Sequence, residues 1–183
     1  LEPASITVVL LARWHVIVAL ENYDSLSQAE TDTHVQKAEK LLAESVQLAR
    51  REEAAQSVST VSRRYASYLY WGTYVRAALA ELTGEPYLSK YREEYQNLFK
   101  FLEQSPNLET NEYIPFAHWL YAHFLIALEG DRDEAKRHLK LTIDFVNTDS
   151  KREVNEFLVF IQGTPNDPPF RDLVDTINPG LLK

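Results

Sequence analysis

Five histidines are the residues of this chain whose type and spacing could support metal binding or acid–base chemistry. His118 and His123 are five residues apart, which separates them by about 140° around a helix and prevents them from sharing a metal ion. Twice, a glutamate precedes a histidine by four residues, so that each pair shares a helix face. These pairs are Glu30 with His34 and Glu134 with His138. The Glu-x-x-His pattern of di-iron helical bundles does not occur, so we expect exposed ion pairs and no metal site.

Arg132, followed by Asp133 and then by His138, resembles the Arg-x4–6-His signature of the all-α ribonucleases called HEPN domains. On one helix, Arg132 and His138 would lie about 240° apart, so they would converge only across a break or a second subunit. The favoured interpretation is an arginine at a helix start and an exposed histidine. We therefore expect no catalytic residues and no intrinsic ribonuclease activity.

Arg13 and His15 flank Trp14 inside the apolar run from Ile6 to Leu20. A charge in such a run must reach water or find a partner, and a salt bridge to an acid on a neighbouring helix is the commoner solution. A small-ligand pocket near Arg13, Trp14 and His15 is the alternative. Serine-nucleophile, phosphate-loop and dinucleotide-binding motifs are missing, so we expect no cofactor.

Tyrosine and arginine gather on one face of the helix expected after residue 58. Arg63, Tyr70 and Tyr74 are separated by seven and four residues and therefore fall within a narrow arc. Exposed tyrosine and arginine are typical of recognition surfaces, so these three residues are the predicted partner-binding site. The alternative is that a neighbouring helix covers the two tyrosines.

Glycine and proline outline an all-α fold, because helix interiors exclude both residues. The breaks and the capping-box spacings Ser27–Glu30 and Ser150–Glu153 predict about seven antiparallel helices in paired hairpins, with no strand. The expected helices cover about 5–22, 27–55, 58–82, 88–105, 112–129, 131–149 and 153–161. We expect a helical domain over 1–162 and a proline-rich tail over 163–183, with a helical turn near 170–177.

Residues 116–149 resemble a tetratricopeptide repeat. Trp119 takes the first tryptophan position of that family's pattern, Ala135 the small position of the second helix, and Leu139 the large position four residues later. Three positions depart from the pattern: Ala122, His123 and Asn147. The resemblance implies a tetratricopeptide-like array of helix pairs, and an irregular helical bundle is the alternative.

Composition narrows the partners. A net charge of −8 argues against nucleic acid, because phosphate binding needs a positive field. The apolar run Ile6 to Leu20 is short and polar in its middle, so we expect no membrane insertion. We expect a cytoplasmic protein, or an exported one whose targeting segment has been removed. The expected function is a scaffold or adaptor that binds a peptide or protein segment, and the alternative is an all-α small-ligand-binding protein or enzyme.

Overall fold

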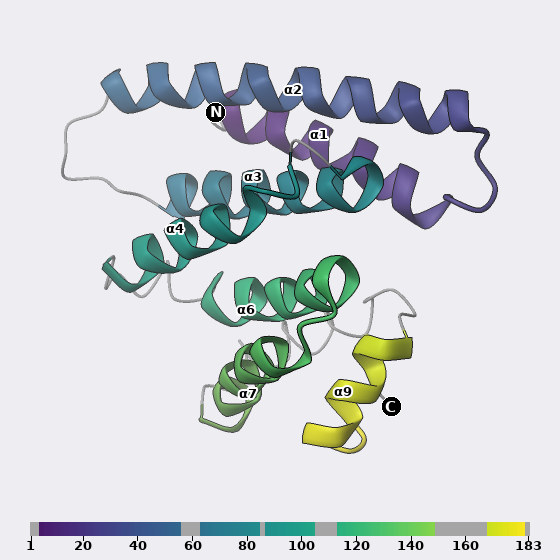
Figure 1. Cartoon of the computed structure of the whole chain (residues 1–183). Helices are drawn as coiled ribbons and strands as arrows, with labels where there is room; N and C mark the ends of the chain where they lie inside the picture. The colour runs from purple at the N-terminus through teal and green to yellow at the C-terminus, as the bar shows by residue number, and fades with distance from the viewer. Residues whose placement is uncertain (1–3, 56–62, 85–86, 105–112, 149–167, 182–183) are drawn as a thin grey trace. The chain divides into compact units, whose positions relative to one another are not determined.

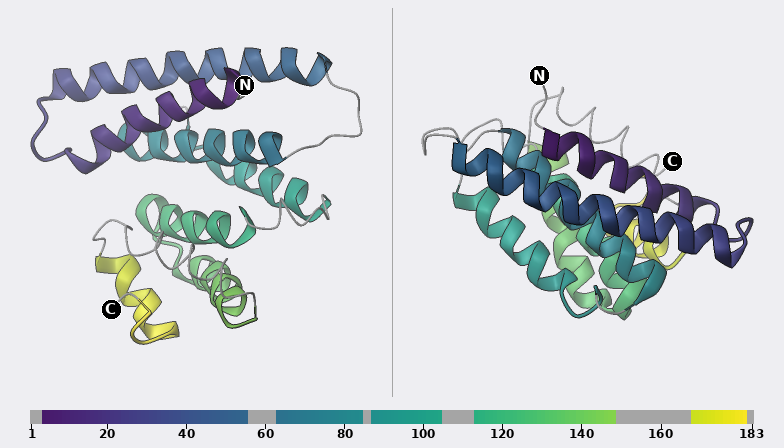
Figure 2. Two further views of the ribbon diagram at one scale, coloured as in Figure 1. Left: turned by 180° about the vertical axis from the view of Figure 1, so that it is seen from behind. Right: turned by 90° about the horizontal axis from the view of Figure 1, so that it is seen from above.

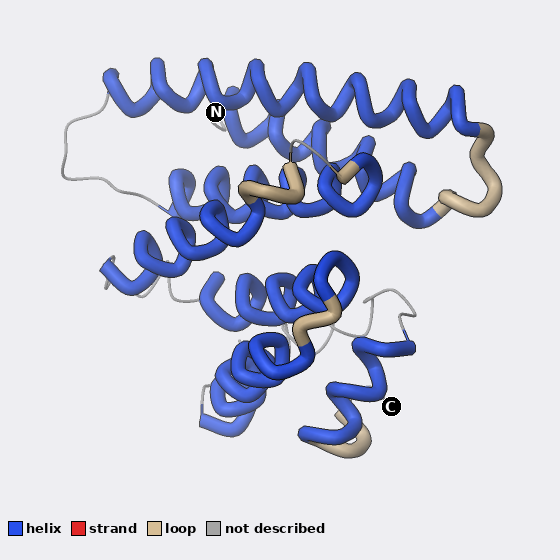
Figure 3. Tube along the Cα trace, in the orientation of Figure 1, coloured by secondary structure: helices blue, strands red, loops and turns tan. Residues whose placement is uncertain are grey.

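The computed structural model describes residues 4–55, 63–84, 87–104, 113–148 and 168–181, and these residues form helices and turns without a strand (Figures 1 and 3). The all-α prediction of about seven helices is confirmed. The α-helices are α1 (Ala4–Glu21), α2 (Gln28–Ala55), α3 (Arg63–Thr83), α4 (Tyr91–Gln104), α6 (Tyr113–Phe124), α7 (Arg132–Thr148) and α9 (Pro168–Ile177). A π-helical segment, η1 (Leu125–Glu129), directly continues α6. The helix expected at 153–161 and its capping box at Ser150 lie outside the described residues.

The start of α2 and the ends of α3 and η1 lie at the capping and glycine residues that the sequence contains. The backbone N–H of Ser27 donates a 2.9 Å hydrogen bond to Oε2 of Glu30, and the hydroxyl of Ser27 donates one of 2.6 Å to the same oxygen, at the start of α2. Gly84 and Gly130 follow α3 and η1 with φ angles of 75° and 65°, which residues with a Cβ adopt only under strain. These contacts confirm the capping box at Ser27 and the two breaks read from the sequence.

Replacing Ser27 with alanine is expected to lower the free energy of unfolding by about 1 kcal/mol, because the cap of α2 is lost. Chemical denaturation measures the change. Ser25→Ala, on the same connection, is the matched control and should change stability less, since its hydroxyl bonds only to the carbonyl of Asn22. Equal effects of the two substitutions would mean that the box adds no stability.

The chain divides into two compact units, 1–110 and 111–183. This division differs from the expected domain over 1–162 with a separate tail. In the first unit, α1 and α2 lie side by side as an antiparallel hairpin (Figures 1 and 2), and α1 also packs on α3. α4 packs on α3 through a buried stripe that consists of Tyr91, Tyr95, Leu98 and Leu102.

The second unit contains the pair that resembles a tetratricopeptide repeat. α6 packs on α7, and α9 packs on α7 and η1. Trp119 of α6 is fully buried, and its ring meets Phe170 of α9 edge-on with 5.1 Å between centroids. The described part of the expected tail therefore forms a ten-residue helix that belongs to this core.

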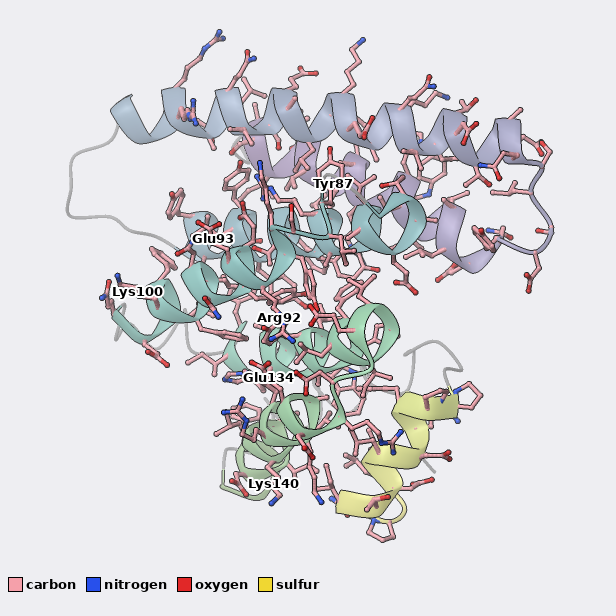
Figure 4. The ribbon with its side chains drawn as sticks, viewed as in Figure 1. Tyr87, Arg92, Glu93, Lys100, Glu134 and Lys140 are labelled. Atoms are coloured by element: carbon pink, nitrogen blue, oxygen red, sulfur yellow. The ribbon has the colours of Figure 1, made fainter. Side chains whose placement is uncertain are left out.

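Ala135 of α7 has no exposed surface, and α7 packs on α6. Replacing it with leucine is expected to destabilise the second unit by roughly 1–3 kcal/mol, because the added atoms have no space. Lys140→Ala on the solvent side of the same helix (Figure 4) is the control, expected within about 0.5 kcal/mol of the parent. A neutral Ala135→Leu variant in urea denaturation would show that the two helices do not pack tightly at this position.

Candidate functional site

The predicted partner-binding tyrosines do not form an open face. Tyr70 is 3% exposed, so the expectation that its ring faces solvent is wrong. Tyr74 is partly exposed, and burial raises the pKa of its hydroxyl to about 12. Both rings flank Trp71 edge-on, at 4.7 Å and 6.1 Å between centroids. Arg63 is the first residue of α3, and its side chain lies outside the described set.

Arg13 has an aromatic partner. Its guanidinium carbon lies 4.2 Å from the centre of a Trp71 ring, which is the geometry of a cation–π contact. This cation–π contact between Arg13 of α1 and Trp71 of α3 takes the place of the expected salt bridge to an acidic residue. Arg13 also lowers the pKa of Tyr74 electrostatically, against the larger effect of burial, so it lies near that hydroxyl as well.

The outer face of α1 carries exposed apolar side chains. We define the α1 face as Thr7, Leu11, Trp14 and Val18, whose spacings of four, three and four residues place them in one line along the helix. Leu11 is 50% exposed and Trp14 is 55% exposed. On its other sides, α1 buries Ile6, Val9, Ala12, Val16 and Ala19. A helix that is apolar nearly all round is thus packed on only part of its circumference.

α1 also has the length and apolar character needed to cross a membrane, and it is the one helix among the described residues that has both. A core helix of a soluble protein and a signal sequence share these properties, so they do not distinguish the three. Expected location and membrane behaviour therefore stay predictions.

Two histidines from α1 and α2 meet at the edge of the α1 face. Nδ1 of His15 lies 2.9 Å from Nδ1 of His34, so one protonated Nδ1 donates to the unprotonated Nδ1 of the other ring. Both side chains are half-buried. The ring of Trp14 borders them, 4.8 Å from His15 and 6.0 Å from His34 between centroids. The pKa of His15 is lowered, first by burial, then by His34 and Lys37.

A second histidine pair joins α6 to α7. Nδ1 of His118 lies 2.7 Å from Nδ1 of His138, and Tyr121 covers His138 edge-on at 4.8 Å between centroids. Burial, and then the charge of His138, lower the pKa of His118 to about 3. Burial also lowers the pKa of His138, against the opposite effect of Glu134. These imidazoles are neutral at pH 7.

The two alternative arrangements, a ribonuclease-like pair and a small-ligand pocket, are not assembled within the described residues. Arg132 is exposed at the start of α7, while His138, on the same unbroken helix, faces α6. Arg13 points to α3, His15 to α2, and Trp14 is half in water, so the three do not converge on one pocket. Among the described residues, no group of three or more His, Asp or Glu side chains could hold a metal ion.

The exposed α1 residues and both histidine pairs escaped the sequence reasoning. Sequence spacing along one helix cannot show contacts between two helices. A sequence signal did exist, because in each pair one histidine precedes and the other follows the connection between two consecutive helices. The two histidines are 19 residues apart in the first pair and 20 residues apart in the second. For α1, the signal was apolar character around the whole helix, which exceeds what one packing surface needs.

In comparisons with known proteins, the chain matches no family model, no curated protein and no solved structure.

Proposed function

We propose that this chain is a protein–protein interaction module, and that the α1 face binds an apolar helical segment of a protein partner. The half-exposed pair Leu11 and Trp14 carries the proposal. Soluble proteins cover contiguous apolar stripes, and a stack of helices needs a polar outer face at its end. The α1 face supplies little polar cover, since its side chains offer two polar groups, the hydroxyl of Thr7 and the indole N–H of Trp14.

A partner helix fits this surface better than an extended peptide. All backbone groups of α1 inside the helix are used in its own hydrogen bonds, so the face offers side chains but no unpaired strand edge. A tryptophan beside a leucine gives a partner helix a ridge to pack against, and tryptophan is a frequent interface anchor. Lys37 on α2 lies near the histidines that border Trp14. An acidic residue at the margin of the partner helix would complement it.

A photo-crosslinking amino acid at position 11 tests the surface in the cells that produce the protein. A crosslinked protein adduct of one defined mass is expected at position 11 and not at the exposed position 36 of α2, the matched control. The captured protein is then identified, and its segment is measured by calorimetry. Leu11→Glu and Trp14→Glu should each weaken binding by more than tenfold, or about 1.4 kcal/mol.

Other results overturn the proposal. An adduct of twice the mass of the chain assigns the α1 face to self-association. A lipid adduct, together with flotation on vesicles that Leu11→Glu abolishes, assigns it to a membrane. No adduct at position 11, or adducts equal to those at position 36, leave the face without a role in recognition.

A further inference from the structure

We infer that His15 and His34 form a two-imidazole site for a late first-row divalent metal ion of tetragonal geometry, Ni²⁺ or Cu²⁺. Imidazole nitrogen is a preferred ligand for these ions. This inference concerns the edge of the α1–α2 hairpin and does not depend on a protein partner. It also departs from the sequence-based expectation of no metal site.

The separation of the two nitrogens fits adjacent positions around such an ion. Metal–imidazole bonds are about 2.0–2.1 Å long, so two ligands at a right angle lie about 2.9 Å apart. The observed Nδ1–Nδ1 distance is 2.9 Å. Little movement of α1 against α2 is therefore needed. The Nδ1 proton of the hydrogen bond passes through solvent to Nε2 of its ring, and both rings turn so that their Nδ1 lone pairs point to an ion beside the line that joins the two nitrogens.

The surroundings leave room for the rest of the coordination shell. His15 and His34 are half-buried, so water can complete the positions that the protein does not fill. Trp14 borders one side without closing it, since its own side chain is 55% exposed. Zn²⁺ in structural sites requires a closed set of four protein ligands, which this edge does not supply.

The pair His118–His138 has the same contact but a different setting. Both rings are more deeply enclosed, and the 2.7 Å contact is bordered by Tyr121. Water would reach an ion there less easily than at His15 and His34. The chain thus contains an internal control with matching donors and restricted access.

Lys37 provides a test that does not remove a ligand. Its charge acts on His15, so it opposes a bound cation. Replacing it with glutamine keeps most of the side chain, and the metal affinity is expected to rise roughly threefold. This variant keeps the inference testable if a histidine substitution disturbs the hairpin.

Calorimetric titration of the purified chain with Ni²⁺ at pH 7.5 is the experiment. One binding event is expected, lost by at least tenfold in His15→Ala and in His34→Ala, retained in His118→Ala, and strengthened in Lys37→Gln. Mg²⁺, which prefers oxygen ligands, should give no heat. Bound Ni²⁺ should also raise the melting temperature of the first unit, because the ion joins α1 to α2.

Four results overturn the inference. No Ni²⁺ binding to the parent chain shows that the pair is a hydrogen bond only. Binding that persists in both His15→Ala and His34→Ala places the ion elsewhere. Mg²⁺ binding of equal strength attributes the heat to the acidic surface. An unchanged affinity in Lys37→Gln places the ion away from Lys37 and therefore away from His15.

Discussion

Trp119→Ala is expected to lower the free energy of unfolding of the second unit by about 3–5 kcal/mol. The indole has no exposed surface and meets the ring of Phe170 at 5.1 Å between centroids. Its removal takes away buried apolar area and leaves a cavity between α6 and α9, which the helices can fill only in part. Small domains have a total stability of about 5–15 kcal/mol, so this change approaches the unfolding threshold.

Trp14→Ala is the matched control, because the same atoms are removed from a side chain that is already 55% exposed. A loss below about 1.5 kcal/mol is expected there, since much less area returns to water. Hydrogen exchange measures both variants, and faster exchange should be confined to α6, α7 and α9 in Trp119→Ala. Equal losses for the two tryptophans would contradict the burial of Trp119.

The sequence predicted the helices well because their ends are local chemistry. Ser27 caps α2 through Glu30, and Gly130 supplies the positive φ that ends η1. Such contacts span three or four residues and are legible in a linear pattern. The buried stripe of α7, which includes Ala135 and Leu139, followed the helical period for the same reason.

The contacts that define the candidate sites join residues far apart in the chain. The ring of Trp71 on α3 forms a cation–π contact with Arg13 on α1, and His34 on α2 forms a hydrogen bond with His15 on α1. The face of Tyr70 was assigned to solvent from the polar residues around it, although tertiary packing decided otherwise. Burial of a tyrosine needs only a neighbour for its ring, which no single-helix pattern can reveal.

The sequence predicted a helical turn near 170–177 in a proline-rich tail, and the structure extends this turn to the ten-residue helix α9. Pro168 and Pro169 occupy the first turn of the helix, where a missing N–H costs nothing. Phe170, Leu173 and Val174 then form its buried side. The π-helical segment η1 had no recognisable signal, and the structure offers no sequence-level reason for its wider turn.

The second unit should lose stability steeply as the pH falls below neutrality. An unperturbed histidine has a pKa near 6.5, whereas burial and His138 hold the pKa of His118 at about 3 in the folded chain. Below pH 6.5 the unfolded chain therefore takes up a proton that the folded chain does not. Each pH unit between about 6 and 4 should cost about 1.4 kcal/mol through this one residue.

The geometry of the histidine pair also predicts a loss of stability at low pH. Two imidazoles with Nδ1 atoms 2.7 Å apart share one proton in a hydrogen bond, and two cations at that distance would repel each other strongly in a buried setting. Burial lowers the pKa of His138, Glu134 opposes this shift and Arg137 adds to it, so His138 contributes to the loss of stability in the same direction.

Urea denaturation at pH 7, 6, 5 and 4.5, followed by hydrogen exchange in α6 and α7, measures the slope. Carboxylates also titrate in this range, so the parent chain is compared with His118→Gln, which keeps a polar side chain and cannot be protonated. The parent should lose stability faster than the variant by about 1.4 kcal/mol per pH unit, whereas the variant should retain the carboxylate background and the contribution of His138. His15→Gln, in the half-buried pair of the first unit, should leave the slope of α6 and α7 unchanged. Parallel slopes for the parent and His118→Gln, or an ordinary pKa of His118 by NMR titration, would show that this pair does not make the second unit sensitive to acid.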